Sequence, residues 1–181
     1  MAANTYSNAQ NVIFDVTSGD KNSGISITGS TPLTLPTGST SAVNWTEIAS
    51  GAPISIGTVS VPGFILVDNT YLANSSGGIT SANSATYAVS TGSGVKISGA
   101  LSAGTSVTIK GIAYSSVSLT AGVDLASSIS SGQLAFGTGG GISITGVNTG
   151  QNGIYVSAAS TLQSGTASIV GGDVNIYGVS T

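Results

Sequence analysis

The stretch Ile54-Ser-Ile-Gly-Thr-Val-Ser-Val-Pro-Gly-Phe-Ile-Leu-Val-Asp68 decides the fold of this chain. Its first half alternates apolar and polar residues, the pattern of a strand with one buried face, and its second half is a dense apolar run. Pro62-Gly63 lies between the halves and favours a turn, because proline presets φ at the second turn position and glycine accepts the positive φ that follows. We therefore expect a half-exposed strand, a corner and a strand buried on both sides, with further strands wrapped around this pair.

The rest of the chain repeats short segments rich in Val, Ile and Thr, separated by clusters of Gly, Ser and Asn. This pattern indicates an all-β protein, and no window has helical spacing with helix-forming residues. The other predicted strands are Val12–Val16, Gly24–Thr28, Leu33–Leu35, Val43–Ile48, Thr86–Ser90, Val95–Ser98, Val107–Ile112, Tyr114–Leu119, Gln133–Phe136, Ile142–Thr145, Ile154–Ser157, Ala167–Val170 and Val174–Tyr177. The apolar phase slips at Gly111, which predicts a β-bulge or bend there.

We predict three parts: an N-terminal arm (residues 1–11), an antiparallel β-sandwich or jelly-roll-like domain (12–125) and a glycine-rich β part (126–181). The hexamer Gly-Ile-Ser-Ile-Thr-Gly of residues 24–29 returns at 141–146. Apolar tripeptides after Val95 recur at about 20–25 residues, near the length of one β-solenoid coil. The C-terminal part is therefore either a solenoid tail or a second small sandwich or hairpin subdomain.

Charge is scarce in this chain. It has 3 Lys+Arg and 6 Asp+Glu, a net charge of −3, no histidine and no cysteine. Charged residues make up 5% of the sequence, against about 25% in ordinary soluble domains. Three cations release few phosphate counterions, so nucleic-acid binding is disfavoured, and thiol and disulfide chemistry are excluded.

Scarce charge also leaves strand edges without their usual protection. We therefore expect neighbouring subunits, of this protein or of other structural proteins, to occupy its edges and faces, because neutral Ser and Thr faces avoid the cost of burying charge. Residues 1–11 have neither a basic nor an apolar signal region, and no window reaches the ~20 apolar residues of a membrane span. We expect no membrane insertion, and synthesis in the cytosol without a cleavable N-terminal signal if Met1 is native.

Few residues of this chain are candidates for catalysis. A glycosidase needs two carboxylates facing one sugar, and no close pair occurs in the sequence, so we expect the acids to serve turns and strand ends. The acids are Asp15, Asp20, Glu47, Asp68, Asp124 and Asp173. Ser18 and Ser93 precede Lys21 and Lys96 at the spacing of a serine–lysine pair, but on glycine-containing turns instead of the helix that the motif requires.

Two glycine-containing segments are also interpreted as ordinary loops. Residues 20–24 begin like a calcium loop, but the glycine comes one position early and no terminal glutamate follows. Residues 137–141 are glycine-rich without the helix or lysine that would hold a phosphate. We predict no catalytic, cofactor-binding or metal-binding residues, no cofactor and no enzymatic activity. Among the aromatic residues, we expect Trp45, Phe14, Phe64 and Phe136 to fill the core.

Several motifs between residues 43 and 125 resemble small β-sandwich proteins of tailed-phage virions. The motifs are Val43-Asn-Trp-Thr-Glu-Ile48, Ile54-Ser-Ile-Gly57, Val61-Pro-Gly-Phe-Ile-Leu-Val-Asp-Asn69 and Leu101-Ser-Ala-Gly-Thr-Ser-Val-Thr-Ile109. The resemblance implies a capsid-decoration, cement or tail-associated subunit with no catalytic residues, although this sequence lacks the charged residues common near the second motif. The C-terminal part is similar to β-helical repeats of large bacterial adhesins.

Three functions follow as hypotheses. The first is a non-enzymatic virion structural protein that acts through subunit contacts, with the N-terminal arm lying along a neighbour. The second is a fragment of an extracellular β-solenoid adhesin or fibre that binds a glycan or a cell surface, which requires Met1 to be artificial. The third, ranked last, is a polysaccharide depolymerase that uses two of the six acids.

Overall fold

The structure is a computed structural model of the 181-residue chain. It describes residues 11–16, 25–32, 44–49, 53–61, 63–69, 92–113, 117–132, 140–148, 150–166 and 169–180. These residues form strands, turns and bends and contain no helix, which confirms the predicted all-β class. They also contain no helix that is long and apolar enough to cross a membrane.

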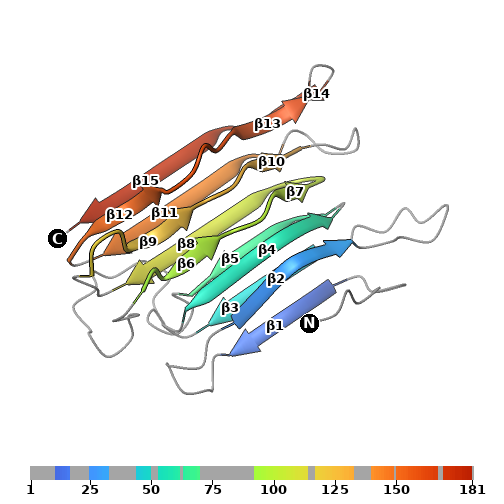
Figure 1. Cartoon of the computed structure of the whole chain (residues 1–181). Coiled ribbons are helices and arrows are strands. Elements are labelled where there is room, and N and C mark those ends of the chain that lie inside the picture. Colours follow the sequence, from blue (N-terminus) through green and yellow to red (C-terminus); the bar gives the residue numbers. More distant parts are fainter. Residues whose placement is uncertain are drawn as a thin grey trace, which may run out of the picture.

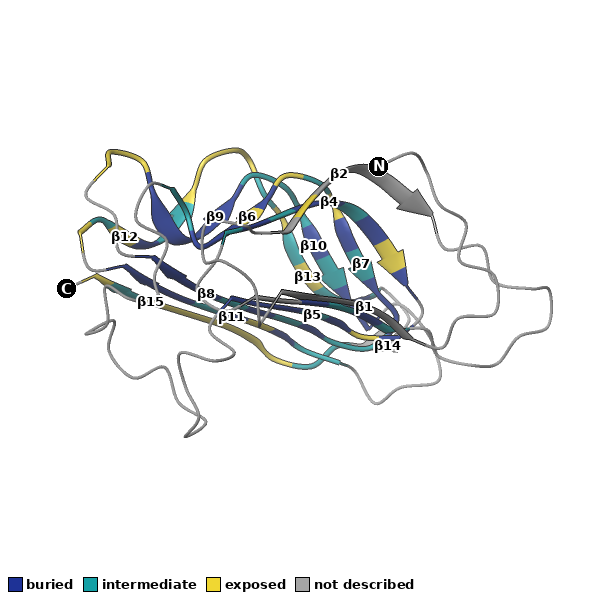
Figure 2. Ribbon diagram, turned by 90° about the horizontal axis from the view of Figure 1, so that it is seen from below, coloured by how far each residue is buried: buried dark blue, intermediate teal, exposed yellow. Residues whose placement is uncertain are grey.

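The strands form two sheets that lie one above the other (Figure 1, Figure 2). Sheet A contains, in spatial order, β1 (Asn11–Val16), β3 (Asn44–Ala49), β5 (Ile65–Asp68), β8 (Val107–Ala113), β11 (Ile142–Asn148) and β15 (Val174–Ser180). Sheet B contains β2 (Ile25–Pro32), β4 (Ile54–Val61), β6 (Val95–Ile97), β7 (Leu101–Ala103), β9 (Ala121–Leu125), β10 (Ile129–Ser131), β12 (Asn152–Val156), β13 (Leu162–Thr166) and β14 (Ile169–Val170).

The chain passes back and forth between the two sheets, so that it winds as a coil. Each sheet A strand up to β11 is followed by one to three sheet B strands, and the next sheet A strand lies beside the previous one. In sheet A neighbouring coils keep their register: Ile65 lies opposite Val107, which lies opposite Ile142. In sheet B the register between β2 and β4 shifts between Ile27 and Ser30. Among the described strands, every pairing is parallel except that of the short β13–β14 pair. This path is that of a two-sheet β-solenoid, with β1 at one end of the stack and β15 at the other (Figure 1).

The predicted antiparallel sandwich or jelly roll is therefore wrong, since the strands pair in parallel with their neighbours one coil away. The error has a physical cause. Parallel sheets usually have both faces covered and consist of continuous apolar strands. Here each sheet buries only the face turned toward the other sheet, so its strands alternate as antiparallel strands do. An alternation with a period of two residues shows that one face of the strand is buried, but it does not show whether neighbouring strands run parallel or antiparallel.

Apolar side chains from successive coils stack in columns between the sheets, where Figure 2 shows the buried residues. In sheet A one column consists of Trp45, Ile65, Val107 and Ile142. In sheet B, Val59, Leu101 and Ile129 form a second column that Leu162 extends. Trp45 fills the core as predicted, whereas Phe64 is 36% exposed at the corner before β5, which corrects its assignment to the core.

The two sheets touch backbone to backbone along a row of glycines. A methyl group on Gly122 of sheet B would lie 2.7 Å from the carbonyl oxygen of Gly111 in sheet A and would overlap the amide of Val147. Gly146 and Gly153 face each other in the same way one coil further along. No bulge occurs at Gly111, because β8 and β11 stay in register through it. The apolar phase shifts there because the sheets approach too closely for any side chain.

Strand β5 ends before its neighbour β8 does, and beyond that point the side chain of Asn69 takes the place of the missing strand backbone. Its side chain accepts a hydrogen bond from the backbone N–H of Ile112 (2.7 Å) and donates one to the carbonyl oxygen of the same residue (3.0 Å). Its own N–H donates to the carbonyl oxygen of Lys110 at 3.1 Å. The buried amide thus completes the hydrogen bonding of the longer strand, which an unpaired buried backbone requires.

Several strand boundaries differ from the prediction. The structure adds the short strands β7 and β10 and the strands β9 and β13, which lack a long apolar run. The predicted strand Tyr114–Leu119 is wrong at its end: residues 117–119 form a turn, in which the Thr120 hydroxyl donates to the carbonyl oxygen of Val117 at 2.7 Å.

Other predictions fall outside the described residues. These are the strands at Leu33–Leu35, Thr86–Ser90 and Gln133–Phe136, the arm up to residue 10 and the turn residue Pro62. The division near residue 126 stays a prediction; both sheets continue across it, since β10 pairs with β7 and β11 with β8.

The glycine contacts predict a large difference between two single substitutions. Gly122→Ala should lower the free energy of unfolding by about 1–3 kcal/mol, because the added carbon must push the sheets apart. Gly92→Ala is the matched control, since a carbon there meets no atom within 4 Å. Urea unfolding of both variants measures the difference, and equal stability of the two would contradict close contact between the sheets.

Candidate functional site

The described acidic residues are spread over the fold. Asp68 and Asp124 lie on the outer faces of sheets A and B, Glu47 lies in the core, and Asp173 is exposed just before β15. Asp15 lies on β1, where only the backbone is described, and Asp20 lies outside the described residues. In the described part of the chain, no three acidic residues gather where they would hold a metal ion.

Two of these acids pair with lysines on the neighbouring coil. Asp68 lies opposite Lys110 in sheet A, with 3.4 Å between the carboxylate and the ammonium nitrogen. Lys96 lies opposite Asp124 in sheet B at 3.8 Å. Both lysines are about half exposed, so each pair contributes at most about 1 kcal/mol. Each pair holds two coils in register, which is a structural use for both carboxylates.

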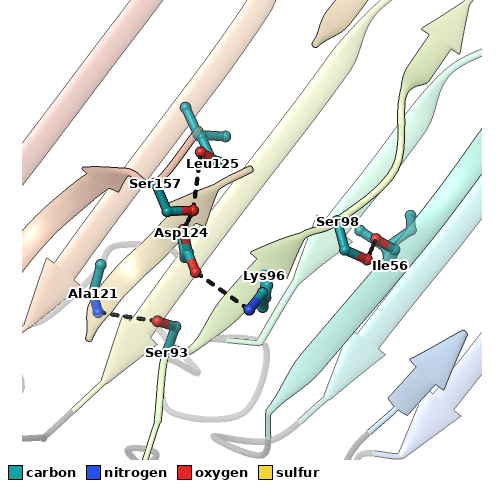
Figure 3. A network of polar contacts seen from close by, with 8 residues as sticks. All are labelled: Ile56, Ser93, Lys96, Ser98, Ala121, Asp124, Leu125 and Ser157. Atoms are coloured by element: carbon teal, nitrogen blue, oxygen red, sulfur yellow. Dashed lines mark hydrogen bonds and ion pairs between the residues drawn. The ribbon is translucent and has the colours of Figure 1, made fainter. Parts of the chain in front are cut away.

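Serine hydroxyls add further links between coils on sheet B (Figure 3). Ser157 donates to the Asp124 carboxylate at 2.5 Å, and Ser98 donates to the carbonyl oxygen of Ile56 at 2.8 Å. Ser93 accepts a hydrogen bond from the backbone N–H of Ala121 at 3.1 Å. Ser93 and Lys96, which share the spacing of a serine–lysine pair, thus have different partners, and neither contact activates a nucleophile.

Glu47 lies in the core beside Trp45, and both side chains are 0% exposed. The indole N–H of Trp45 donates to one carboxyl oxygen at 2.8 Å, and the other oxygen has no hydrogen-bond partner. Burial raises the pKa of Glu47 from 4.5 to about 7, although the hydrogen bond from Trp45 acts in the opposite direction. The prediction that the acids serve turns and strand ends is wrong for this residue, which occupies a core column beside Val67.

A column of small polar residues runs along the outer face of sheet B. Ser60, Ser102 and Ser130 occupy matching positions on successive coils, and Gln163 continues the column on β13. Parallel strands place such neighbours about 4.8 Å apart. We call these four residues, three serines and one glutamine, the hydroxyl column. Ser60 and Gln163 are exposed, and Ser102 and Ser130 are half-buried.

A second outward column lies on the same face and contains Ser55, Lys96, Asp124 and Tyr155. Together the two columns offer hydroxyl, amide and phenol groups with one ion pair. Such a surface forms hydrogen bonds with a polar uncharged ligand without a large desolvation cost. It is the candidate binding face of this protein.

Sequence reasoning missed the hydroxyl column, although a signal for it exists. The tripeptides Val59-Ser-Val, Leu101-Ser-Ala and Ile129-Ser-Ser each place a serine between two inward residues. Their unequal spacing hides the repeat, because the turns between them vary in length.

Comparison of the sequence with known protein families and with curated proteins finds no match, and neither does comparison with solved structures. The fold defines the class on its own: a two-sheet parallel β-solenoid.

The buried Glu47 predicts how stability depends on pH. A carboxyl group whose pKa is higher in the folded than in the unfolded chain stabilises the fold fully below the unfolded value, and this contribution is lost as pH rises through the folded value. Between pH 4.5 and about 7, the free energy of unfolding should therefore fall by about 3 kcal/mol.

Glu47→Gln should remove this fall in the free energy of unfolding with rising pH, since the amide does not titrate. Asp173→Asn, which changes an exposed carboxyl group, should keep it. Urea unfolding at several pH values measures both. An unchanged slope in Glu47→Gln would show that another group is responsible.

Proposed function

We propose that this chain is a non-enzymatic β-solenoid module of an extracellular adhesin or fibre, and that it binds a glycan or a glycan-bearing cell surface. The observation that carries this proposal is the candidate binding face of sheet B, where polar side chains repeat from coil to coil. A regular row of hydroxyl and amide groups fits a regular chain of sugars, because both present hydrogen-bonding groups at short intervals.

The placement of the acids supports a structural role over hydrolysis. Glycoside hydrolysis needs two carboxyl groups on either side of one sugar. Glu47 lies between the sheets, and Asp68 and Asp124 lie on opposite sheets, each paired with a lysine. A solenoid is also suited to an extended fibre, since each coil stacks on the one before and the length grows coil by coil.

The virion structural subunit is the second candidate. Its predicted sandwich fold is wrong, so the resemblance to phage β-sandwich proteins no longer supports it through the fold. One observation still favours it: the last coil of the stack exposes apolar residues, which fits a protein that works through contacts between subunits.

A binding experiment tests the proposed function. The purified chain is applied to an array of immobilised bacterial and host polysaccharides and to whole cells. Ser60→Glu combined with Gln163→Glu should weaken binding by about tenfold or more, because the two charges disrupt the hydroxyl column.

Ser143→Glu is the matched control, since Ser143 is exposed on the outer face of sheet A and should not affect binding. Failure of the unaltered chain to bind any glycan or cell would overturn the adhesin proposal. Equal weakening by the control would place the ligand elsewhere.

A further inference from the structure

Apolar residues of β15 and β12 are exposed, although their register neighbours in the preceding coil are buried. Val174 and Ile176 on β15 occupy the same columns as Ile142 and Ile144, which are 1% and 0% exposed. At the last coil these two side chains are 42% and 54% exposed, and Val156 on β12 is 57% exposed. The described residues place no further coil over these side chains, and we call this edge of the described stack the open end.

The edge of β15 also lacks the usual protection against pairing with another strand. Its sequence, Val-Asn-Ile-Tyr-Gly-Val-Ser, contains no charged residue and no proline. Natural edge strands are normally blocked by charge, proline or a bulge, and solenoid ends are normally covered by a polar cap. β15 pairs with β11 along its whole length, and its other edge faces away from the stack (Figure 1).

The opposite end of the stack carries a strand that matches this edge. β1 pairs with β3 on one side, and it is the outermost strand of sheet A at the N-terminal end. Its residues Val12 and Phe14 stand at the register positions of Trp45 and Glu47, which belong to the inward columns. The chain therefore has, at each end of the same sheet, a strand that continues the register of the columns.

We propose that a second copy of this chain docks on the open end, with its β1 pairing in parallel with β15 of the first copy. Continuing the register brings Val12 of the second copy opposite Val174, and Phe14 opposite Ile176. The same register brings Asp15 of the second copy opposite Tyr177, which is 64% exposed.

A head-to-tail contact is favoured over a symmetric one. A two-fold axis at the open end would pair β15 with itself in antiparallel, which breaks the columns that every earlier coil in sheet A maintains in parallel. Head-to-tail contacts leave one free end of each kind, so they repeat and build a filament. This inference goes beyond the proposed function, since filaments can form whether or not the outer face binds a glycan.

Cysteine cross-linking tests the inference directly, because the chain has no cysteine of its own. The proposed register places Ile13 of one copy opposite Asn175 of the other. Ile13→Cys and Asn175→Cys variants are mixed and oxidised, and covalent heterodimers should form. Asp15→Cys and Tyr177→Cys provide a second pair if the first disturbs folding.

Ser143→Cys is the control, since Ser143 lies in the same column as Asn175 but inside the stack, and it should not cross-link to Ile13→Cys. Homodimers of Asn175→Cys as the main product would overturn the head-to-tail arrangement. If the unaltered chain sediments as a monomer at the highest soluble concentration, docking of a second copy is overturned altogether. Something other than a second copy would then cover the open end.

A charge at the open end provides an independent readout. Ile176→Lys should weaken self-association by about tenfold or more, because the ammonium group would be buried in the contact. Val117→Lys places the same charge on an equally exposed apolar residue in the turn between β8 and β9 and should leave association unchanged. Equal effects of the two variants in sedimentation velocity would contradict the proposed interface.

Discussion

Contact between the backbones of the two sheets is the constraint on which the rest of the structure depends. At Gly111, Gly122, Gly146 and Gly153 the sheets lie so close that no Cβ atom fits between them. Such contact fixes how β8, β9, β11, β12 and β15 lie relative to one another, because the glycines of one sheet must meet the backbone of the facing strand. With this contact set, the Ile, Val and Leu residues stack in columns, and their burial supplies most of the stability.

Polar groups in this fold mostly serve the stacking. Asn69 completes a strand that is too short, and the Asp68–Lys110 and Lys96–Asp124 pairs join neighbouring coils. Glu47 is the exception, since a carboxyl group with one unpartnered oxygen lies in an otherwise apolar core. The loss of stability caused by burying this carboxyl group depends on pH, so the coil that contains Trp45 and Glu47 is more stable near pH 4.5 than at neutral pH.

Part of the fold could be predicted from the sequence. Alternating apolar residues correctly indicate strands, and the corner predicted at Pro62-Gly63 falls between two strands that lie in different sheets, β4 and β5. Strand direction could not be predicted, because one buried face gives the same alternation in parallel and antiparallel sheets. The role of Gly111 depends on Gly122 across the core, and local sequence shows only a shift of phase. The hydroxyl column was missed because its serines are brought together by coils of unequal length.

The central claim is that successive coils stack in parallel and in register, and NMR of the isotopically labelled chain tests it most directly. Val107, Ile142 and Val174 lie in neighbouring sheet A strands at matching positions. Parallel stacking predicts cross-strand contacts between the amide and Hα protons of these residues and their register neighbours, repeated at the same offset along each strand. Antiparallel strands would instead give strong Hα–Hα contacts at the closely spaced pairs, with sequence numbers that run in opposite directions, and that result would contradict the solenoid.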